Sequence, residues 1–385
     1  MTAWLNDGVI DAIAEQATAA DQSRTIAPAA IDGLRASPVM AMTAARDLGG
    51  RDACVVETAA VLREVVAACS STAWCLWNHL CTFHLFCGLL GPEHARQLTQ
   101  VVKASEWVCF PAGASTGVQA EQHGDTLVLN GKAAFGSGSR YAQWAGVTFV
   151  GEDRRQPHFA LVDLRSPGVR IDPTWQAMSL RASSTDDVHY EGVEVSVSQV
   201  VPFPMMYRLH FRKPEVPMIA PRYREDWVGV SDLWLGAMAA SLCQAALDDI
   251  CSGIRERVAI MGVKVAERPL VQVNLGHAQG LITAAADTVQ AALTATDQRI
   301  ACATTPTEQV YLQQMSASMQ ALQLCDEAMR LMLRVQGGNG LREGASFERR
   351  YRDFQAMPLH INAHRDRVSE QVGRALLGLE TTNPF

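Results

Sequence analysis

The strongest pointer to the fold lies near the end of the chain, in Tyr351-Arg352-Asp353-Phe354-Gln355-Ala356-Met357-Pro358-Leu359-His360. This segment follows the glycine-rich run Gln336-Gly337-Gly338-Asn339-Gly340, which comes directly after a long helical pattern. A glycine run in that place is typical of a helix C-terminus, where glycine readily adopts the left-handed conformation. The pattern of apolar residues predicts one further helix, from Phe347 to Leu379, that carries the quoted segment.

The apolar pattern changes its period twice along the chain. From Asp7 to about Ser105 apolar residues recur at three- and four-residue spacing, which is typical of helices. From about Trp107 to Pro204 the period falls to two, and short strands are expected at 126–131, 146–150, 158–162 and 188–195. A proline-rich connector over 201–221 then leads to long helical segments, expected at 226–261, 270–302, 307–337 and 347–379.

Helices followed by strands and then by helices predict an α+β protein that is mainly α-helical and has three parts. We expect an N-terminal helical domain over residues 1–105 and a central β-barrel over 106–205. A C-terminal four-helix bundle is expected over 206–385.

The composition excludes several classes of protein. A chain of 385 residues with 48% hydrophobic and 19% charged residues can bury a large core. A net charge of -7 with scattered Lys and Arg excludes the basic surface of a nucleic-acid-binding protein. Residues 1–16 lack the basic start of a secretory signal. The most apolar segment, 69–90, contains Asn78, His79 and His84, which would be costly inside a bilayer, so a buried helix is expected rather than a membrane span.

The ten cysteines are expected to be reduced thiols, mostly small residues of the core. No Cys-x-x-Cys pair occurs, and the chain is long and lacks an export signal. A cytoplasmic location is therefore expected.

The glycine run, the pair Arg352-Asp353 and His360 together resemble the C-terminal helices of the acyl-CoA dehydrogenase superfamily. Many dehydrogenases of that family carry their catalytic carboxylate in a Tyr-Glu-Gly-Thr segment, where this chain has His360-Ile361. Loss of the carboxylate with gain of a histidine resembles the flavin-dependent monooxygenases built on the same fold. Members of that branch act on thiophenes, phenols, indoles and amino sugars.

The resemblance implies the oxygenase component of a two-component system. A separate reductase would supply reduced FMN or FAD, and the chain would use O2, through a C4a-hydroperoxyflavin, to oxygenate a small aromatic or heteroatom-containing substrate. The resemblance also implies a homotetramer whose subunits complete each other's flavin sites.

The segment with the two-residue period contributes the expected flavin contacts. In the resembling branch a Phe-x-Ser-Gly segment lies along the isoalloxazine ring, and Phe135 and Ser137 stand in those places. The hydroxyl of Ser137 would then act near N5 or the reacting oxygen. A glycine-rich hairpin turn would leave the same pattern. A second family segment, before a strand, implies flavin or phosphate contacts from Ser183, Ser184 and Thr185.

Three residues are expected to bind the phosphate end of the flavin. The resemblance places Arg268 against the pyrophosphate, and the backbone amides of Gly337 and Gly338 near the phosphate or adenine of a neighbouring subunit. From the residues alone, a solvated arginine and a helix cap fit equally well.

Histidines carry the proposed proton transfers. His360 would deprotonate a phenol, indole or amine, or donate to the reacting oxygen. The resemblance places His79 in the substrate pocket as a second catalytic group, with His84 as its alternative, and Trp107 is expected to line that pocket. His360 and His364 have zinc-ligand spacing, but no Glu follows the first histidine and no Cys lies nearby, so no metal is expected.

Two rival interpretations remain open. An acyl-CoA dehydrogenase would need a carboxylate base, and Glu225 or Asp226 lies about where some family members carry it at the start of the first bundle helix. A flavin-binding or assembly protein without turnover would have the same sequence features.

Overall fold

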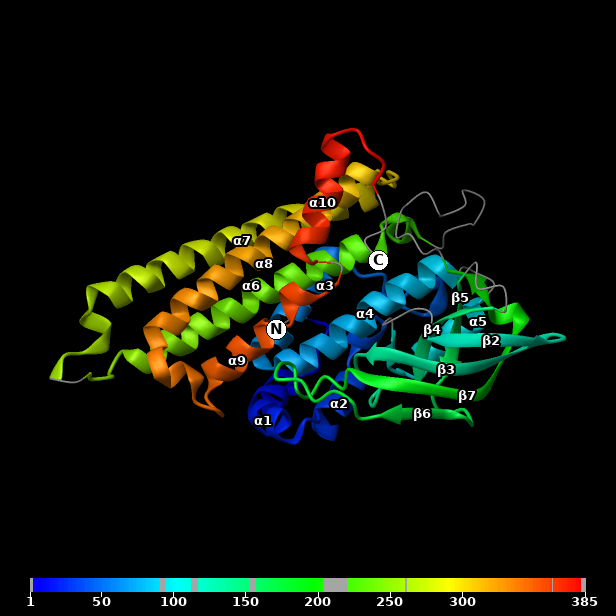
Figure 1. The fold of residues 1–385 in the computed structure, drawn as a ribbon, viewed down its shortest axis with the longest axis horizontal. Helices are drawn as coiled ribbons and strands as arrows, with labels where there is room; N and C mark the ends of the chain where they lie inside the picture. The colour runs from blue at the N-terminus through cyan, green and yellow to red at the C-terminus, as the bar shows by residue number, and fades with distance from the viewer. Residues whose placement is uncertain are drawn as a thin grey trace.

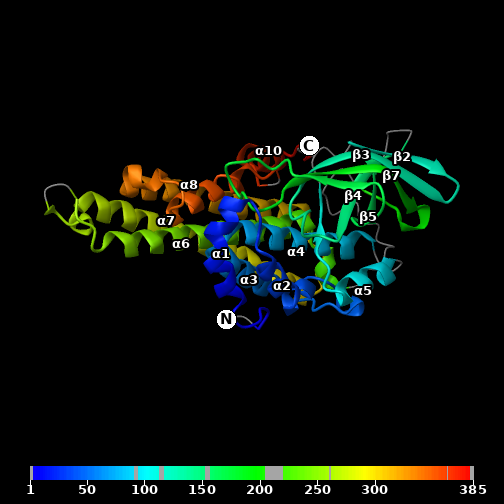
Figure 2. The ribbon, with the colours of Figure 1, turned by 90° about the horizontal axis from the view of Figure 1, so that it is seen from below.

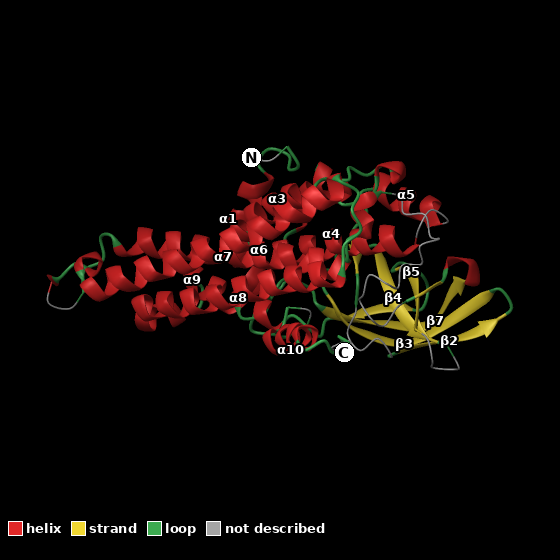
Figure 3. Ribbon diagram, turned by 90° about the horizontal axis from the view of Figure 1, so that it is seen from above, coloured by secondary structure: helices red, strands yellow, loops and turns green. Residues whose placement is uncertain are grey.

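The computed structural model describes residues 3–90, 94–111, 117–151, 157–203, 220–259, 262–361 and 363–381. Helices dominate these residues, and the strands gather at one end of an elongated molecule (Figure 3). The boundary expected between residues 205 and 206 lies outside the described residues.

The N-terminal part is helical, as expected. Its helices are α1 Val9–Ser23, α2 Pro28–Arg35, α3 Val55–Ala68, α4 Ser70–Leu90 and α5 Ala95–Lys103. Helix α4 is apolar on all sides and nearly all of its side chains are buried, as in the core helix of a large protein. It packs against α3, α6 and β1, and it runs from the helical body toward the sheet (Figure 1).

The strands form one mixed sheet. They are β1 Val108–Cys109, β2 Val118–His123, β3 Thr126–Gly136, β4 Trp144–Val150, β5 Pro157–Asp163, β6 Val169–Asp172, β7 Asp186–Ser196 and β8 Val201–Pro202. The four expected strands are confirmed as β3, β4, β5 and β7. The order is β6-β7-β3-β2-β4-β5-β8, with β1 parallel beside β4. Within the described strands the sheet is not closed, so the expected barrel is wrong in that respect: its end strands, β6 and β8, have only four and two residues.

The C-terminal part contains three long helices that pack side by side, α6 Trp227–Ile254, α7 Pro269–Ala301 and α8 Glu308–Gln336. Helix α6 is the one described helix apolar and long enough to cross a membrane, yet 83% of its most apolar window is buried inside the protein. It is therefore the central helix of this part. Figure 2 shows α1, α2 and α3 on the opposite side of the molecule from the C-terminal helix α10.

The single helix expected over 347–379 is wrong. The chain forms α9 Ser346–Phe354, a 3-10 turn at Met357–Leu359 and α10 Arg365–Leu376. Pro358 lies in the break, and proline lacks the backbone N–H that an α-helix needs at that point. His360 consequently has an extended backbone, with φ of -60° and ψ of 132°. His364 occupies the N-cap position of α10 and makes no side-chain hydrogen bond there, so the two histidines do not share a helical face.

All ten cysteines are free thiols, and those of α4, Cys75, Cys81 and Cys87, are buried. This agrees with the expectation that they serve as small core residues.

Candidate functional site

The candidate site is built around the loop of residues 177–186, which joins β6 to β7 and contains the expected flavin contacts Ser183, Ser184 and Thr185. Two non-glycine residues of this loop have left-handed backbones, Leu180 with φ of 49° and Ser184 with φ of 47°. Each such residue costs about 1–2 kcal/mol relative to ordinary backbone. Contacts from outside the 177–186 loop must therefore hold its shape.

Helix α9 provides one group of these contacts. Asp353 accepts the Leu180 N–H at 2.6 Å through Oδ1, and the Ser179 hydroxyl donates to the carbonyl oxygen of Arg352. Burial raises the pKa of the Asp353 carboxyl to about 6, although the Leu180 N–H opposes that shift. The left-handed Leu180 is thus fixed directly by a buried acceptor.

Arg352 extends this cluster to the N-terminus of the protein. Its guanidinium donates to the Met178 carbonyl oxygen at 2.5 Å and pairs with Asp21 of α1 at 2.8 Å and with Glu348. Both carboxylates and the arginine are largely buried, so the ion pairs are weakly screened by solvent. Helices α1 and α9 are joined to the 177–186 loop in this way.

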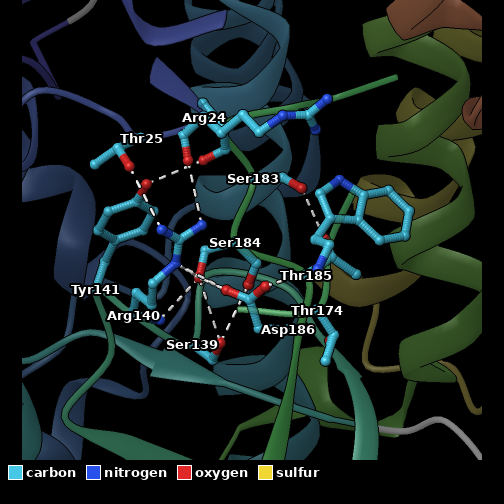
Figure 4. A network of polar contacts seen from close by, with 12 residues as sticks. Arg24, Thr25, Ser139, Arg140, Tyr141, Thr174, Ser183, Ser184, Thr185 and Asp186 are labelled. Atoms are coloured by element: carbon cyan, nitrogen blue, oxygen red, sulfur yellow. Dashed lines mark hydrogen bonds and ion pairs between the residues drawn. The ribbon is translucent and has the colours of Figure 1, made fainter. Parts of the chain in front are cut away.

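Arg140 holds the other end of the loop (Figure 4). Its Nε donates to Asp186 Oδ2 at 2.8 Å and to Ser184 Oγ at 3.0 Å, and the Ser184 hydroxyl donates to the same Asp186 oxygen. The guanidinium also reaches the Arg24 carbonyl oxygen at 3.2 Å and the Thr25 hydroxyl at 3.4 Å. Ser184 is therefore committed to this network rather than presented to a ligand.

The hydroxyls of Ser137, Thr185 and Ser183 form a buried chain. Ser137 Oγ lies 3.0 Å from Thr185 Oγ1, which lies 2.7 Å from Ser183 Oγ. The indole Nε1 of Trp74, on α4, donates to Ser137 Oγ at 3.0 Å. Residues expected from two separate motifs are thus brought together, and a tryptophan of α4 completes the group.

His360 lies against the same tryptophan. Its ring contacts the rings of Trp74 and Trp77 edge-on, with centroid separations of 5.8 and 5.1 Å. Its Nδ1 is buried and has no hydrogen-bond partner in the described part of the chain. Burial lowers the pKa of His360 to about 4, so the imidazole is neutral at pH 7. A neutral ring with an unused nitrogen is suited to exchange a proton with a ligand.

His79 has a different environment from the one expected. The Val108 N–H donates to its Nδ1 at 3.1 Å, so Nε2 carries the proton and donates to the Met40 carbonyl oxygen at 2.9 Å. Burial lowers the pKa of His79 to about 4. With both nitrogens bound to main chain, His79 holds β1 against α4 and has no nitrogen left for a substrate.

His84 and Trp107 are also fully buried. Arg222 Nε donates to His84 Nδ1 at 3.3 Å, and His84 Nε2 lies 3.2 Å from the Glu225 carbonyl oxygen. Trp107 lies beside the His79 ring at 5.3 Å and its Nε1 has no partner in the described residues. The structure therefore groups Trp107 with His79 rather than with His360.

Phe135 lies at the edge of the site, on the surface. The register between β3 and β7 shifts between Ala133 and Gly136, and Phe135 at this bulge has φ of 60°. Its side chain is 61% exposed and its ring meets Trp175 edge-on at 6.4 Å. An aromatic surface thus lies two residues from Ser137, where a flat ring could pack.

The carboxylates of the rival dehydrogenase interpretation are engaged in structural bonds. Glu225 forms a two-point ion pair with Arg299, both bonds at 2.8 Å, and accepts from Gln314 at 3.0 Å. Asp226 caps α6 by accepting the Val228 N–H at 2.8 Å. Neither arrangement is that of a base poised to abstract a proton.

Arg268, Gly337 and Gly338 line a single surface pocket with a volume of about 930 Å³. The same pocket is also lined by Arg257, Arg334 and Arg342, and no Asp or Glu is among its described lining residues. A Cβ added at either glycine would meet no atom within 4 Å, so their backbone is open to the pocket. The Gly337 N–H itself is already used, because it donates to the Leu333 carbonyl oxygen at the end of α8. Guanidinium groups with no opposing carboxylate suit a phosphate or pyrophosphate.

This arginine pocket and the hydroxyl chain lie far apart in one chain. The pocket is next to the hairpin between α6 and α7, at the end of the molecule opposite the sheet (Figure 1). Among the described residues, no group of three or more His, Cys, Asp or Glu could hold a metal ion.

Comparisons with known proteins show what this chain is similar to. Residues 233–365 match the acyl-CoA dehydrogenase C-terminal domain. A pigment production hydroxylase of Rhodococcus sp. is 24% identical over 98% of this chain and 96% of its own. The oxygenase component of an FADH2-dependent resorcinol hydroxylase from Rhizobium sp. is 25% identical over 98% and 94%. The solved 3-HSA hydroxylase of Rhodococcus sp. RHA1 superposes with a TM-score of 0.87 at 20% identity, over 98% and 97% of the two chains.

Over nearly its whole length the chain is thus similar to a hydroxylase and to the oxygenase component of a flavin-dependent hydroxylase, and it shares the fold of the solved 3-HSA hydroxylase. Several residues of the candidate site are not marked by any motif in the sequence. Trp74 lies in an apolar helical segment where it resembles any core tryptophan, and Arg140 belongs to no recognisable motif. The available sequence signal for the other pocket arginines is their position, with Arg257 before Arg268 and with Arg334 and Arg342 on either side of the glycine run.

The Asp353 contact gives a prediction about stability. Asp353→Ala leaves the buried Leu180 N–H without an acceptor and should lower the free energy of unfolding by about 1–3 kcal/mol. Asp353→Asn keeps an acceptor oxygen and should lose clearly less, as measured by denaturant unfolding of both variants. Equal losses would show that the charge, and not the hydrogen bond to Leu180, is what matters.

Proposed function

We propose that this protein is the oxygenase component of a two-component flavin-dependent monooxygenase. It takes reduced FMN or FAD from a separate reductase and uses O2 to oxygenate a small aromatic or heteroatom-containing substrate. The observation that carries the proposal is that Trp74 contacts both His360, which has an unused nitrogen, and Ser137. The relatives named as hydroxylases and oxygenase components, which this chain covers almost end to end, support it.

The residues around Trp74 suit a flat, redox-active flavin. The bound cofactor would supply the activated oxygen. Ser137 offers it one adaptable hydroxyl, and Phe135 offers an aromatic surface beside that hydroxyl. Neutral His360 takes a proton from a phenol, indole or amine substrate, which strengthens the substrate as a nucleophile. Buried Trp74 keeps water from the reacting atoms.

The arginine pocket is assigned to the phosphate end of the flavin. Because Arg268, Gly337 and Gly338 lie far from Ser137 within one chain, they would serve a flavin that is held mainly by a neighbouring subunit. This separation supports an assembly in which subunits complete each other's sites, and we propose the homotetramer that the resemblance implies.

The proposal includes the layout of three parts, over 1–105, 106–205 and 206–385, with α10 packing on α8 as the fourth helix of the bundle. It also includes a cytoplasmic location, in keeping with ten free thiols. The dehydrogenase alternative has little support, because Glu225 and Asp226 are bound in an ion pair and a helix cap.

The first test of the function is direct. When chemically reduced flavin is mixed with oxygen and the protein, the absorbance of oxidised flavin should return only after a lag. When a substrate is also present, product should form. His360→Ala should keep the lag and lower product formation by about 10²–10⁴, the usual contribution of a positioned proton acceptor. Stopped-flow absorbance and product analysis measure the two effects.

His79→Ala is not a suitable control, because it would break the packing of β1. His364→Ala is suitable, because His364 lies at the start of α10 on the other side of the turn and should leave turnover unchanged. Reoxidation at the protein-free rate, together with bleaching of bound oxidised flavin by an acyl-CoA, would establish the dehydrogenase instead.

The pKa of His360 predicts the pH dependence. The folded-state pKa of about 4 lies below the ordinary value of 6.5, so the imidazole stays neutral until the pH approaches 4. The acid limb of kcat/KM should therefore fall near pH 4 rather than near 6.5 in wild type. The residual activity of His360→Ala should not show this acid limb. A limb at pH 6.5 that vanishes in this variant would show that His360 is solvated in the working enzyme.

The arginine pocket predicts a loss of flavin affinity. Arg268→Ala removes a charged donor and should weaken binding of reduced FAD by about 10- to 100-fold, as expected for a charge-assisted hydrogen bond. Arg330→Ala is a matched control, because Arg330 pairs with Asp326 on α8 and does not line the pocket. Anaerobic titration followed by fluorescence compares them, and equal affinities would remove the pocket from the flavin site.

A further inference from the structure

Trp74 lies at the start of the chain of hydroxyls. Its Nε1 lies 3.0 Å from Ser137 Oγ, and both side chains are buried, with 7% and 6% of their surfaces exposed. An indole N–H can only donate, so Ser137 must accept this bond whatever else it does. One of the two lone pairs of the Ser137 oxygen is therefore always occupied.

The remaining bonds of the chain can be counted. Ser137, Thr185 and Ser183 have one hydroxyl proton each, and two of these protons are used in the two bonds that join the three oxygens. The third proton is free to leave the chain at one of its three members. If Ser183 donates to Thr185 and Thr185 donates to Ser137, the free proton belongs to Ser137. In that order both lone pairs of Ser137 are filled, by Thr185 and by Trp74.

We propose that Trp74 is a positioning residue that makes Ser137 a hydrogen-bond donor toward the reacting end of the flavin. The inference rests on the proposed function. An acceptor that reaches Ser137 selects the order in which Ser183 donates to Thr185 and Thr185 to Ser137. With the second lone pair held by Trp74, Ser137 meets the acceptor with its proton. Without the indole N–H, Ser137 can equally turn its free lone pair to a donor or to stray water.

The same indole also fixes the place of His360. The Trp74 ring lies edge-on to the His360 ring at 5.8 Å and contacts Trp77 at 4.8 Å. The hydroxyl donor and the imidazole are therefore set relative to each other by one rigid side chain. A small displacement of Trp74 would move both groups together.

Trp74→Phe tests the proposal, because it keeps an aromatic ring against His360 and removes only the N–H donor and part of the indole. Trp77→Phe is the matched control. Trp77 lies one turn further along α4, also contacts His360, and donates its Nε1 to the Ser231 carbonyl oxygen at 2.9 Å, away from Ser137. Both variants make a similar packing change, and only one touches the hydroxyl chain.

The measurement is the lag before oxidised-flavin absorbance returns, together with the ratio of product to hydrogen peroxide. Trp74→Phe should shorten the lag and lower the ratio by about two- to tenfold, the effect of one ordinary hydrogen bond. Trp77→Phe should change neither quantity by as much. In the Ser137→Ala background Trp74→Phe should add little, because the partner of the lost donor is already gone.

A spectroscopic readout checks the bond without flavin. The indole N–H resonance of Trp74 should shift in Ser137→Ala, while that of Trp77 should not. Equal effects of the two tryptophan variants, or an undiminished effect of Trp74→Phe in Ser137→Ala, would overturn this inference alone. A wild-type protein that shows no lag would overturn the proposed function, and this inference with it.

Discussion

The hydrogen bond from the Leu180 N–H to Asp353 holds a backbone that would otherwise relax. Leu180 and Ser184 both have left-handed conformations that glycine adopts without strain and that these residues do not. Asp353 fixes the first, and Arg140 together with Asp186 fixes the second. Ser183 lies between them and Thr185 directly follows Ser184, so both hydroxyls of this segment depend on its backbone. The geometry of the site therefore depends on groups that belong to α9 and to the turn after β3.

Regular elements were predictable because burial imposes a period on the sequence. The long helices α6, α7 and α8 and the strand β7 repeat their apolar residues over many positions, and all were expected. The break at Pro358 was also visible in the sequence, since proline cannot continue a helix, but the apolar pattern on both sides was given more weight. Closure of the sheet was not predictable, because it depends on whether the distant strands β6 and β8 meet.

The site residues likewise divide into those that a local motif marks and those whose role depends on the folded structure. Ser137 and His360 were found through local motifs, and each stands in a turn whose sequence is distinctive. The environment of His79 could not be read from its helix, because its two partners, Met40 and Val108, lie 39 and 29 residues away in the chain. The place of Trp74 at the junction is equally invisible, since a buried tryptophan in an apolar helix looks like any core residue. Contacts between residues distant in the chain decide which histidine nitrogen has no hydrogen-bond partner.

The left-handed backbone at Leu180 and Ser184, two residues that are not glycine, has a physical consequence for the site. A glycine loop would take the same shape without strain, but it would also have many other conformations before a ligand binds. Leu180 and Ser184 restrict the alternatives, and the buried bonds to Asp353 and Arg140 make the strained conformation the favoured one. The serine and threonine hydroxyls then stand in place before any ligand arrives, so binding does not have to order them. Rigid placement of this kind suits a reaction in which a hydroxyl donor and an imidazole must face one reactive atom.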